Sequence, residues 1–204
     1  MSERRAHWER VYEQRAPDAV SWFQEAPATS LALIERAGIA RADAILDVGG
    51  GASTLAGALL ARGYTHVSVL DLSERALEHA RARLGVRASE VTWIRADVTE
   101  VELDGHYRLW HDRAVFHFLT EERDRARYRA LLQRVLEPGG QAIVATFALD
   151  GPERCSGLPV VRYAPETLRA ALGGDLSLEE AQAEEHLTPA GGVQRFVFCR
   201  FRRP

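Results

Sequence analysis

The sequence predicts an α/β fold, a doubly wound and mostly parallel sheet of seven strands with helices on both faces and an antiparallel last strand. From residue 43 onward, short apolar runs alternate with segments of helical spacing, which is typical of a parallel sheet. The first unit, residues 44–60, has the order strand, glycine turn, helix. Two stretches near the end, 176–186 and 193–201, alternate apolar and polar residues and indicate a closing antiparallel hairpin. We expect the 204 residues to form one domain.

Residues 1–42 precede the first expected strand and are expected to be helical. A first helix over residues 3–15 is indicated by apolar residues at helical spacing, and Pro17 ends it. Its patterned positions are Trp8, Val11, Tyr12 and Arg15. After an aromatic patch at residues 20–25, a second helix is expected to begin at Thr29 or Ser30 and to end at Gly38.

The remaining elements follow in alternation up to an irregular insertion at residues 148–164. The expected strands lie at residues 45–48, 66–70, 91–94, within 107–118, and at 141–147. The expected helices run from Thr54 to Gly63, from an N-cap at Ser73 to Gly85, from an N-cap at Thr120 to Glu137, and from Pro165 onward. We therefore divide the domain into an N-terminal segment (1–42), a ligand-binding half (43–147) and a substrate loop with closing strands (148–204).

Composition excludes several classes of partner. A formal net charge of −3 gives no reason to expect nucleic acid or an anionic membrane as a partner. Cys155 and Cys199 form neither a metal-ligand pair nor a disulfide framework, so we expect a reducing compartment, no metal site, and a cytoplasmic protein. No apolar run approaches the length of a membrane span.

The glycine turn predicts a nucleoside site. Gly49, Gly50 and Gly51 follow the first strand, and glycines without Cβ atoms let backbone N–H groups approach a ligand closely. Asp71 follows the second strand about twenty residues on, where doubly wound folds place a carboxylate for ribose hydroxyls. A dinucleotide fingerprint would need glycine at Thr54, and no phosphate-loop Gly-Lys pair is present. The pattern indicates a nucleoside ligand without a pyrophosphate.

In these motifs the chain resembles the class I S-adenosylmethionine-dependent methyltransferases, which have a Rossmann-like fold. The resemblance rests on Asp47-Val-Gly-Gly-Gly51, Asp71, Ala96-Asp97 and Leu136-Glu-Pro-Gly-Gly140. It implies that Asp71 binds the ribose and Asp97 the adenine amino group, while Asp47 either contacts the cofactor or orders the glycine loop. It also implies that the N-terminal segment closes over the cofactor. The expected cofactor-binding residues are Tyr12, Trp22, Asp47, Gly49, Gly50, Gly51, Asp71, Leu72, Ala96, Asp97, Val98 and His111.

The acceptor site is expected at the end of the fourth strand, since ligands of open parallel sheets bind outside the carboxyl ends of the strands. Asp112, Arg113 and His117 are the candidate catalytic residues there, with His117 as a candidate general base. The segment Trp110-His-Asp-Arg-Ala resembles that of thiopurine S-methyltransferases, as do Trp8 and Trp22-Phe-Gln24. This resemblance implies that Arg113 lies at the acceptor.

Arg113 favours a thiol acceptor on physical grounds. A free thiol of pKa about 8.5 is only a few per cent ionised at neutral pH, and the thiolate is the nucleophile. A fixed guanidinium beside a sulfonium would stabilise the thiolate and repel a lysine ammonium. Phe116, Phe118 and Phe147 could provide an apolar pocket. We therefore expect a small acceptor such as a thiol, hydrosulfide or related chalcogen.

Two alternatives remain open at this stage. The N-terminal pattern with Trp8, Tyr12 and Trp22 is also similar to a group of protein-lysine methyltransferases. Those usually carry an Asp-Lys/Glu-Gly-Thr segment where this chain has Asp112-Arg-Ala-Val115. The second alternative is a cofactor-binding protein without catalysis, although the intact Gly49–Gly51, Asp71 and Asp97 set speaks against it.

Overall fold

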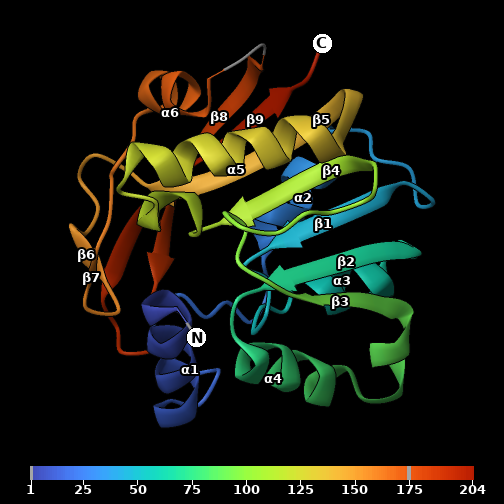
Figure 1. Cartoon of the computed structure of the whole chain (residues 1–204). Coiled ribbons are helices and arrows are strands. Elements are labelled where there is room, and N and C mark those ends of the chain that lie inside the picture. Colours follow the sequence, from blue (N-terminus) through green and yellow to red (C-terminus); the bar gives the residue numbers. More distant parts are fainter. Residues whose placement is uncertain (1, 174–175) are drawn as a thin grey trace.

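The computed structural model describes residues 2–173 and 176–204, and within these residues the main sheet has seven strands in the order β3-β2-β1-β4-β5-β9-β8 (Figure 1). Its strands are β1 (Ala44–Val48), β2 (His66–Asp71), β3 (Val91–Arg95), β4 (Tyr107–Arg113), β5 (Leu136–Phe147), β8 (Ser177–Leu187) and β9 (Val193–Arg202). The predicted fold class is confirmed.

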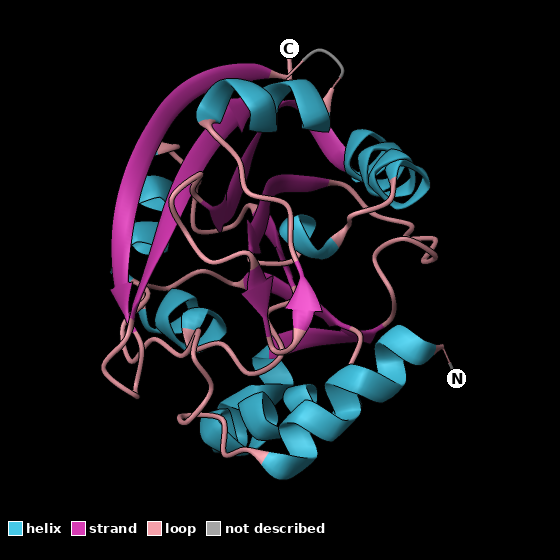
Figure 2. Cartoon of the chain, turned by 90° about the vertical axis from the view of Figure 1, so that its left-hand side faces the viewer, coloured by secondary structure: helices cyan, strands magenta, loops and turns pink. Residues whose placement is uncertain are grey.

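The first five strands, β1 to β5, are parallel. The long β8–β9 hairpin closes the sheet: β9 pairs antiparallel with β5, and β8 pairs antiparallel with β9 (Figure 2). Strand order reverses between β1 and β4, where Asp47 pairs in register with His111. The carboxyl ends of the strands at this point form the usual ligand crevice of a doubly wound sheet.

Two layers of helices cover the sheet because strand side chains alternate between its faces. Ile45 belongs to the core beneath α2, α3 and α4, whereas its neighbour Leu46 belongs to the core beneath α5 and α6. The covering helices are α2 (Ala28–Arg36), α3 (Leu55–Ala61), α4 (Glu74–Leu84), α5 (Glu122–Val135) and α6 (Pro165–Leu172). The first helix, α1 (Glu3–Gln14), lies beside α4 at the carboxyl end of the sheet (Figure 1).

Several boundaries differ from the expectation. Helix α5 begins after Glu121 rather than at a Thr120 cap, and β5 begins at Leu136, five residues earlier than expected. The early start arises because Tyr107 pairs with Leu136 across an irregular register, and because Gly139 takes a positive φ of 72° and donates to Arg203. Tertiary pairing therefore overrides the Pro-Gly-Gly turn signal.

Two further segments differ in detail. Helix α2 begins at Ala28, so Ser30 lies inside the helix instead of capping it. The insertion at 148–164 contains a short hairpin of β6 (Arg154–Cys155) and β7 (Leu158–Pro159). The N-cap at Ser73 is confirmed, since its hydroxyl accepts from the Ala76 amide at 3.2 Å. No helix in the described ranges is long and apolar enough to cross a bilayer.

Candidate active site

Two adjoining cavities open at the carboxyl ends of β1, β2, β3 and β4. The larger has a volume of about 820 Å³ including its mouth, and the smaller about 530 Å³. Both fall within the range of small-molecule sites. The residues that line both cavities are Tyr12, Trp22, Val48, Gly49 and Arg113.

Asp71 ends β2 at the floor of the larger cavity and is 7% exposed. Its carboxylate accepts from the Gly51 amide at 3.0 Å and the Ser73 amide at 2.8 Å, which fixes it against the glycine loop. Burial raises the pKa of Asp71 to about 6, while these two hydrogen bonds lower it and nearby Asp47 raises it. Leu72, Ala96 and Val98 line the same cavity.

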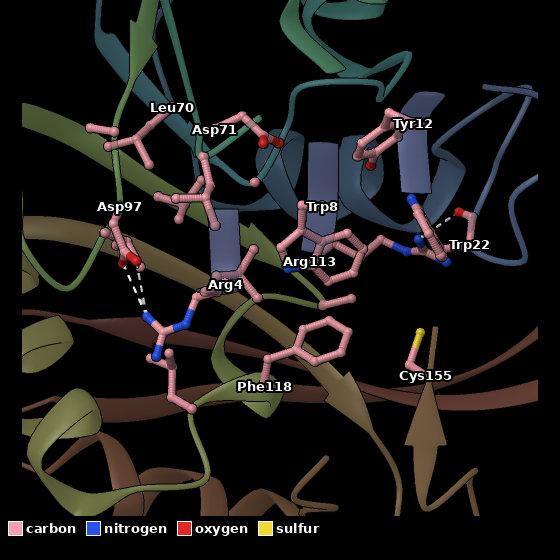
Figure 3. A pocket seen from close by; sticks show the side chains of 18 of the residues that line it. Arg4, Trp8, Tyr12, Trp22, Leu70, Asp71, Asp97, Arg113, Phe118 and Cys155 are labelled. Carbon is pink, nitrogen blue, oxygen red and sulfur yellow. Dashed lines mark hydrogen bonds and ion pairs between the residues drawn. The ribbon is translucent and has the colours of Figure 1, made fainter. Parts of the chain in front are cut away.

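Asp97 follows β3 and lines the same cavity, and its carboxylate is held by a residue that no sequence motif marks. Arg4 of α1 donates through Nη1 to both carboxylate oxygens, at 3.2 and 3.1 Å (Figure 3). Through Nη2 it donates to Asp124. Asp97 also accepts from the backbone and hydroxyl of Thr99, at 2.9 and 2.7 Å. The carboxylate is therefore oriented before any ligand arrives.

A buried chain of polar groups lines the smaller cavity. His111 Nδ1 lies 2.7 Å from Asp47 Oδ1, and His111 Nε2 lies 2.9 Å from Ser30 Oγ. Because a carboxylate only accepts, Nδ1 carries the proton. Asp47 Oδ2 has no partner among the described residues, so the structure shows no bond from Asp47 to the loop amides. This free oxygen is available to a ligand's amino group.

In the glycine loop, the positions of Gly49 and Gly51 leave no room for a side chain. Gly49 has a positive φ of 71°, and a Cβ there would lie 2.1 Å from Val115 Cγ2. A Cβ at Gly51 would lie 2.6 Å from both Asp71 Oδ2 and Ala76 Cβ. Gly49 and Gly50 line the cavities, whereas Gly51 lies behind Asp71.

Arg113 ends β4, and its side chain, only 11% exposed, lies between the two cavities. Nη1 donates to the Trp22 carbonyl at 2.9 Å, and the guanidinium carbon lies 4.5 Å from the centre of the Phe196 ring. Nη2 is 3.7 Å from Glu184 Oε1, too far for a hydrogen bond. Nε and Nη2 are unpartnered among the described residues. Burial lowers the pKa of Arg113 to about 10, and Glu184 opposes that change. The side chain remains cationic at neutral pH.

Asp112 and His117, two of the three predicted catalytic residues, lie outside both cavities. The Asp112 carboxylate is fully buried and accepts from the Val115 amide, the Phe116 amide and the Tyr128 hydroxyl, so it holds the turn after β4. Burial, with a smaller effect of Arg113, lowers the pKa of His117 to about 3, and His117 Nδ1 accepts from the Phe147 amide. Neither side chain lines the space in which a ligand would bind, and the lowered pKa makes His117 a weak base for a thiol.

Aromatic residues of the N-terminal segment cover the larger cavity. Trp8 packs edge to face on Trp22, with ring centres 5.7 Å apart, and on Phe118 at 5.1 Å. Tyr12 and Trp22 line both cavities, as the expected lid residues would. Phe147 and Phe118 contribute to the larger cavity, but Phe116 packs on Tyr128 away from it.

Comparison with known proteins agrees with this geometry. Residues 45–140 match a family model described as a methyltransferase domain. The chain spans about a fifth of the curated relatives that it matches. Two of these are the eEF1A lysine and N-terminal methyltransferases of Danio rerio, 28% identical over 148 residues, and Mus musculus, 28% identical over 151 residues. The matches cover 71% and 70% of this chain and 21% of each relative.

Solved structures show the same fold over nearly the whole chain. One comes from work on the conversion of a disulfide bond into a thioacetal group during echinomycin biosynthesis (TM-score 0.80, 21% identity, covering 98% of this chain and 92% of the other). Another is an S-adenosylmethionine-dependent methyltransferase of Anabaena variabilis (TM-score 0.77, 13% identity, 100% and 96%). Residues 45–140 therefore match a methyltransferase domain, and the solved structures of the same fold include a complex with S-adenosylmethionine.

The residues that line the two cavities are chemically suited to S-adenosylmethionine. The free Asp47 oxygen can accept from the amino group, and Asp71 can accept from ribose hydroxyls. Within the part of the chain that the structure describes, Asp97 Oδ2 accepts only from Arg4, and it keeps room for a second donor. Leu70 and Val98 offer apolar walls to a ring. When bound, the cofactor supplies an electrophilic methyl group.

Asp71 is expected to make cofactor binding pH-dependent. In the free protein its carboxyl holds a proton below about pH 6, whereas ribose hydroxyls favour the ionised acceptor. If binding of a ligand lowers the pKa of a group, the affinity for that ligand falls as the group becomes protonated in the free protein. We therefore expect S-adenosylhomocysteine affinity to be full above pH 6 and to fall up to about tenfold per pH unit below it. Titration calorimetry between pH 5 and 8 would measure this, and Asp71→Asn should give weaker but flat binding.

Sequence reasoning missed three residues of the candidate site, namely Arg4, Ser30 and Phe196. Cys155, by contrast, lies in the segment that the sequence predicts as a lid or substrate wall. Cys155 is buried in the wall of the larger cavity, where burial raises the pKa of its thiol to about 11. Arg4 and Phe196 reach the site only through chain folding, since their partners are distant in sequence. No local pattern marks them.

Proposed function

We propose that this methyltransferase transfers the methyl group by in-line displacement to a small nucleophile, most favourably a thiol, hydrosulfide or related chalcogen. The observation that carries this proposal is Arg113. Its buried guanidinium borders the cavity with two N–H-bearing nitrogens unpartnered among the described residues. The acidic residues described in the lining of the larger cavity, Asp71 and Asp97, both belong to the cofactor side.

Arg113 selects an anionic acceptor for a physical reason. The carboxylate paired with it, Glu184, is 3.7 Å away and is shared with Gln24, so the positive charge is incompletely compensated. An acceptor thiolate beside Arg113 would have its pKa lowered, whereas a lysine ammonium would be repelled. The apolar walls of Phe118, Phe147 and Phe196 favour a reaction in which opposite charges neutralise each other.

The acceptor is expected to enter as an anion, because His117 lies outside the cavity and is a weak base. The acceptor sulfur uses its lone pair to form the new bond to the methyl carbon while the bond from that carbon to the sulfonium sulfur breaks. The products are a thioether and a neutral sulfide. The role of the protein is positioning, which can contribute roughly 7–11 kcal/mol.

Sulfur chemistry also occurs in a protein of this fold, the one studied for the conversion of a disulfide bond into a thioacetal group. The named curated relatives favour instead the alternative of a protein-lysine methyltransferase. This chain covers only 21% of the length of each of these relatives, so the acceptor has to be identified by experiment.

We expect the purified protein to methylate a subset of small thiols or hydrosulfide from labelled S-adenosylmethionine. Because the anion reacts, kcat/KM should rise with pH up to the pKa of the acceptor thiol. Matching alcohols and amines serve as controls and should stay unlabelled. A parallel incubation with a cell lysate tests the alternative of a protein-lysine acceptor. The lysate is separated afterwards into volatile, small-molecule and protein fractions. Label on protein lysines, with none on thiols, would refute the thiol proposal.

A further inference from the structure

One face of α1 forms a wall of the larger cavity. Arg4, Trp8 and Tyr12 follow one another at four-residue spacing, which places them on one side of a helix, and all three line the cavity (Figure 3). The adjacent side, with Glu9 and Glu13, faces α4. Three successive turns of α1 thus border the space that the cofactor must enter and leave.

Little apolar burial holds this helix. Tyr12 is its one buried residue across Glu3–Gln14, and Trp8 remains only partly buried between Trp22 and Phe118. A helix with so little buried apolar surface docks with a small free energy and opens readily. Its closed position therefore depends on polar contacts. Those at two points, Arg4 and Glu9, are the most extensive, and Glu13 and the Tyr12 carbonyl add single contacts to Arg75 and His79.

The first point is Arg4. Its guanidinium bridges Asp97, at the end of β3, and Asp124, near the start of α5, and it also donates to the Thr99 hydroxyl at 3.2 Å. Asp97 and Asp124 are each 7% exposed. Hydrogen bonds between ionised groups are about twice as strong as neutral ones. One side chain thus ties three separate elements together across the adenine side of the cavity.

The second point is Glu9, whose carboxylate accepts from the first turn of α4. Its partners are the Ser73 hydroxyl at 3.0 Å and the amides of Glu74 and Arg75 at 2.9 and 3.3 Å. Burial raises the pKa of Glu9, but these three bonds outweigh it, and the net pKa is lowered. The ionised carboxylate also suits the positive end of α4.

We infer that Arg4 is a clasp that retains the bound cofactor by holding α1 closed over it and Asp97 in place. Among the described residues, Asp97 Oδ2 accepts only from Arg4, so it can receive an adenine amino group without releasing the guanidinium. The bound cofactor and the Arg4 contacts therefore stabilise each other, and the cofactor is released only after the Arg4 contacts break. The inference concerns the cofactor alone, so it does not depend on the identity of the acceptor.

The test is the release rate of S-adenosylhomocysteine, followed by stopped-flow fluorescence of Trp8 and Trp22 at the cavity. We expect Arg4→Ala to release it about tenfold faster or more, since several charge-assisted bonds are lost. Hydrogen exchange of the amides of residues 5–14 should also become faster in this variant. Arg4→Lys, which keeps the charge but cannot bridge both carboxylates, should fall between.

Arg10→Ala is the matched control, because Arg10 is an exposed arginine of the same helix without a hydrogen bond or ion pair in the described ranges. It should leave both readouts near the wild-type values. A wild-type release rate in Arg4→Ala would overturn the inference, even if α1 exchanges faster. Slower release would overturn it too, because Arg4 would then compete with the cofactor for Asp97. Should Arg4→Ala fail to fold, Arg4→Lys decides by the same criteria.

Discussion

Replacing Gly51 with alanine is expected to lower the affinity for S-adenosylhomocysteine by more than about 100-fold, from the loss of hydrogen bonds to a charged group. The new Cβ would lie 2.6 Å from Asp71 Oδ2 and from Ala76 Cβ, closer than such atoms can approach. Asp71 must then move, which breaks its 3.0 Å bond from the Gly51 amide and displaces the carboxylate that we expect to accept from the ribose hydroxyls. One methyl group thus disrupts both the loop and the carboxylate.

Titration calorimetry with S-adenosylhomocysteine measures this effect, and a thermal melt confirms that the variant is folded. Gly105→Ala is the control, since a Cβ there would meet its nearest neighbour, a ring carbon of Tyr107, at an ordinary 3.5 Å. It should bind as the wild type does. An affinity of Gly51→Ala within threefold of the wild type would show that the loop can relax and that Asp71 is not held as described.

Arg113→Met is expected to reduce kcat/KM for the thiol acceptor by about 100-fold or more, a loss typical of removing one preorganised electrostatic contact. Methionine keeps the length of the side chain and its packing on Phe196 but removes the charge that favours a thiolate. Cofactor affinity should change by less than threefold, because Asp47, Asp71 and Asp97 provide the expected polar contacts. The substitution is therefore expected to lower kcat/KM for the thiol without a matching loss of cofactor affinity.

Single-turnover kinetics at several pH values distinguish the effect of the Arg113 charge from the effect of its packing. Arg113→Lys retains a cation and should recover part of the rate, and Arg62→Met, at an exposed position after α3, should have no effect. If Arg113→Met methylates thiols at the wild-type rate, the acceptor does not lie beside the guanidinium. If it instead gains activity on lysine, repulsion by Arg113 was the barrier to the protein acceptor.

Much of the fold follows from patterns that are local in the chain. The β1 unit with Gly49–Gly51 and the carboxylate of Asp71 lie within about thirty residues, so strand and helix periodicity alone predicts where they meet. The closing hairpin is equally local, since β8 and β9 are neighbours in sequence as well as in the sheet. The boundaries of α5 and β5 were less predictable, because pairing with Tyr107 extends the strand into the Pro-Gly-Gly segment.

The fold class, a nucleoside site and the positions of Asp47, Asp71 and Asp97 near strand ends could be predicted from the sequence, because they follow from the short-range order of strand, turn and helix, and the resemblance to a known family added the cofactor. Tertiary structure alone decided the charge and burial of each group. It directed Asp112 into the core and left Arg113 at the cavity, although the two are adjacent in sequence. It also brought Arg4 to Asp97 across 93 residues. Neighbouring strand residues face opposite sides of a sheet, and long-range ion pairs leave no periodicity, so neither outcome can be predicted from local patterns.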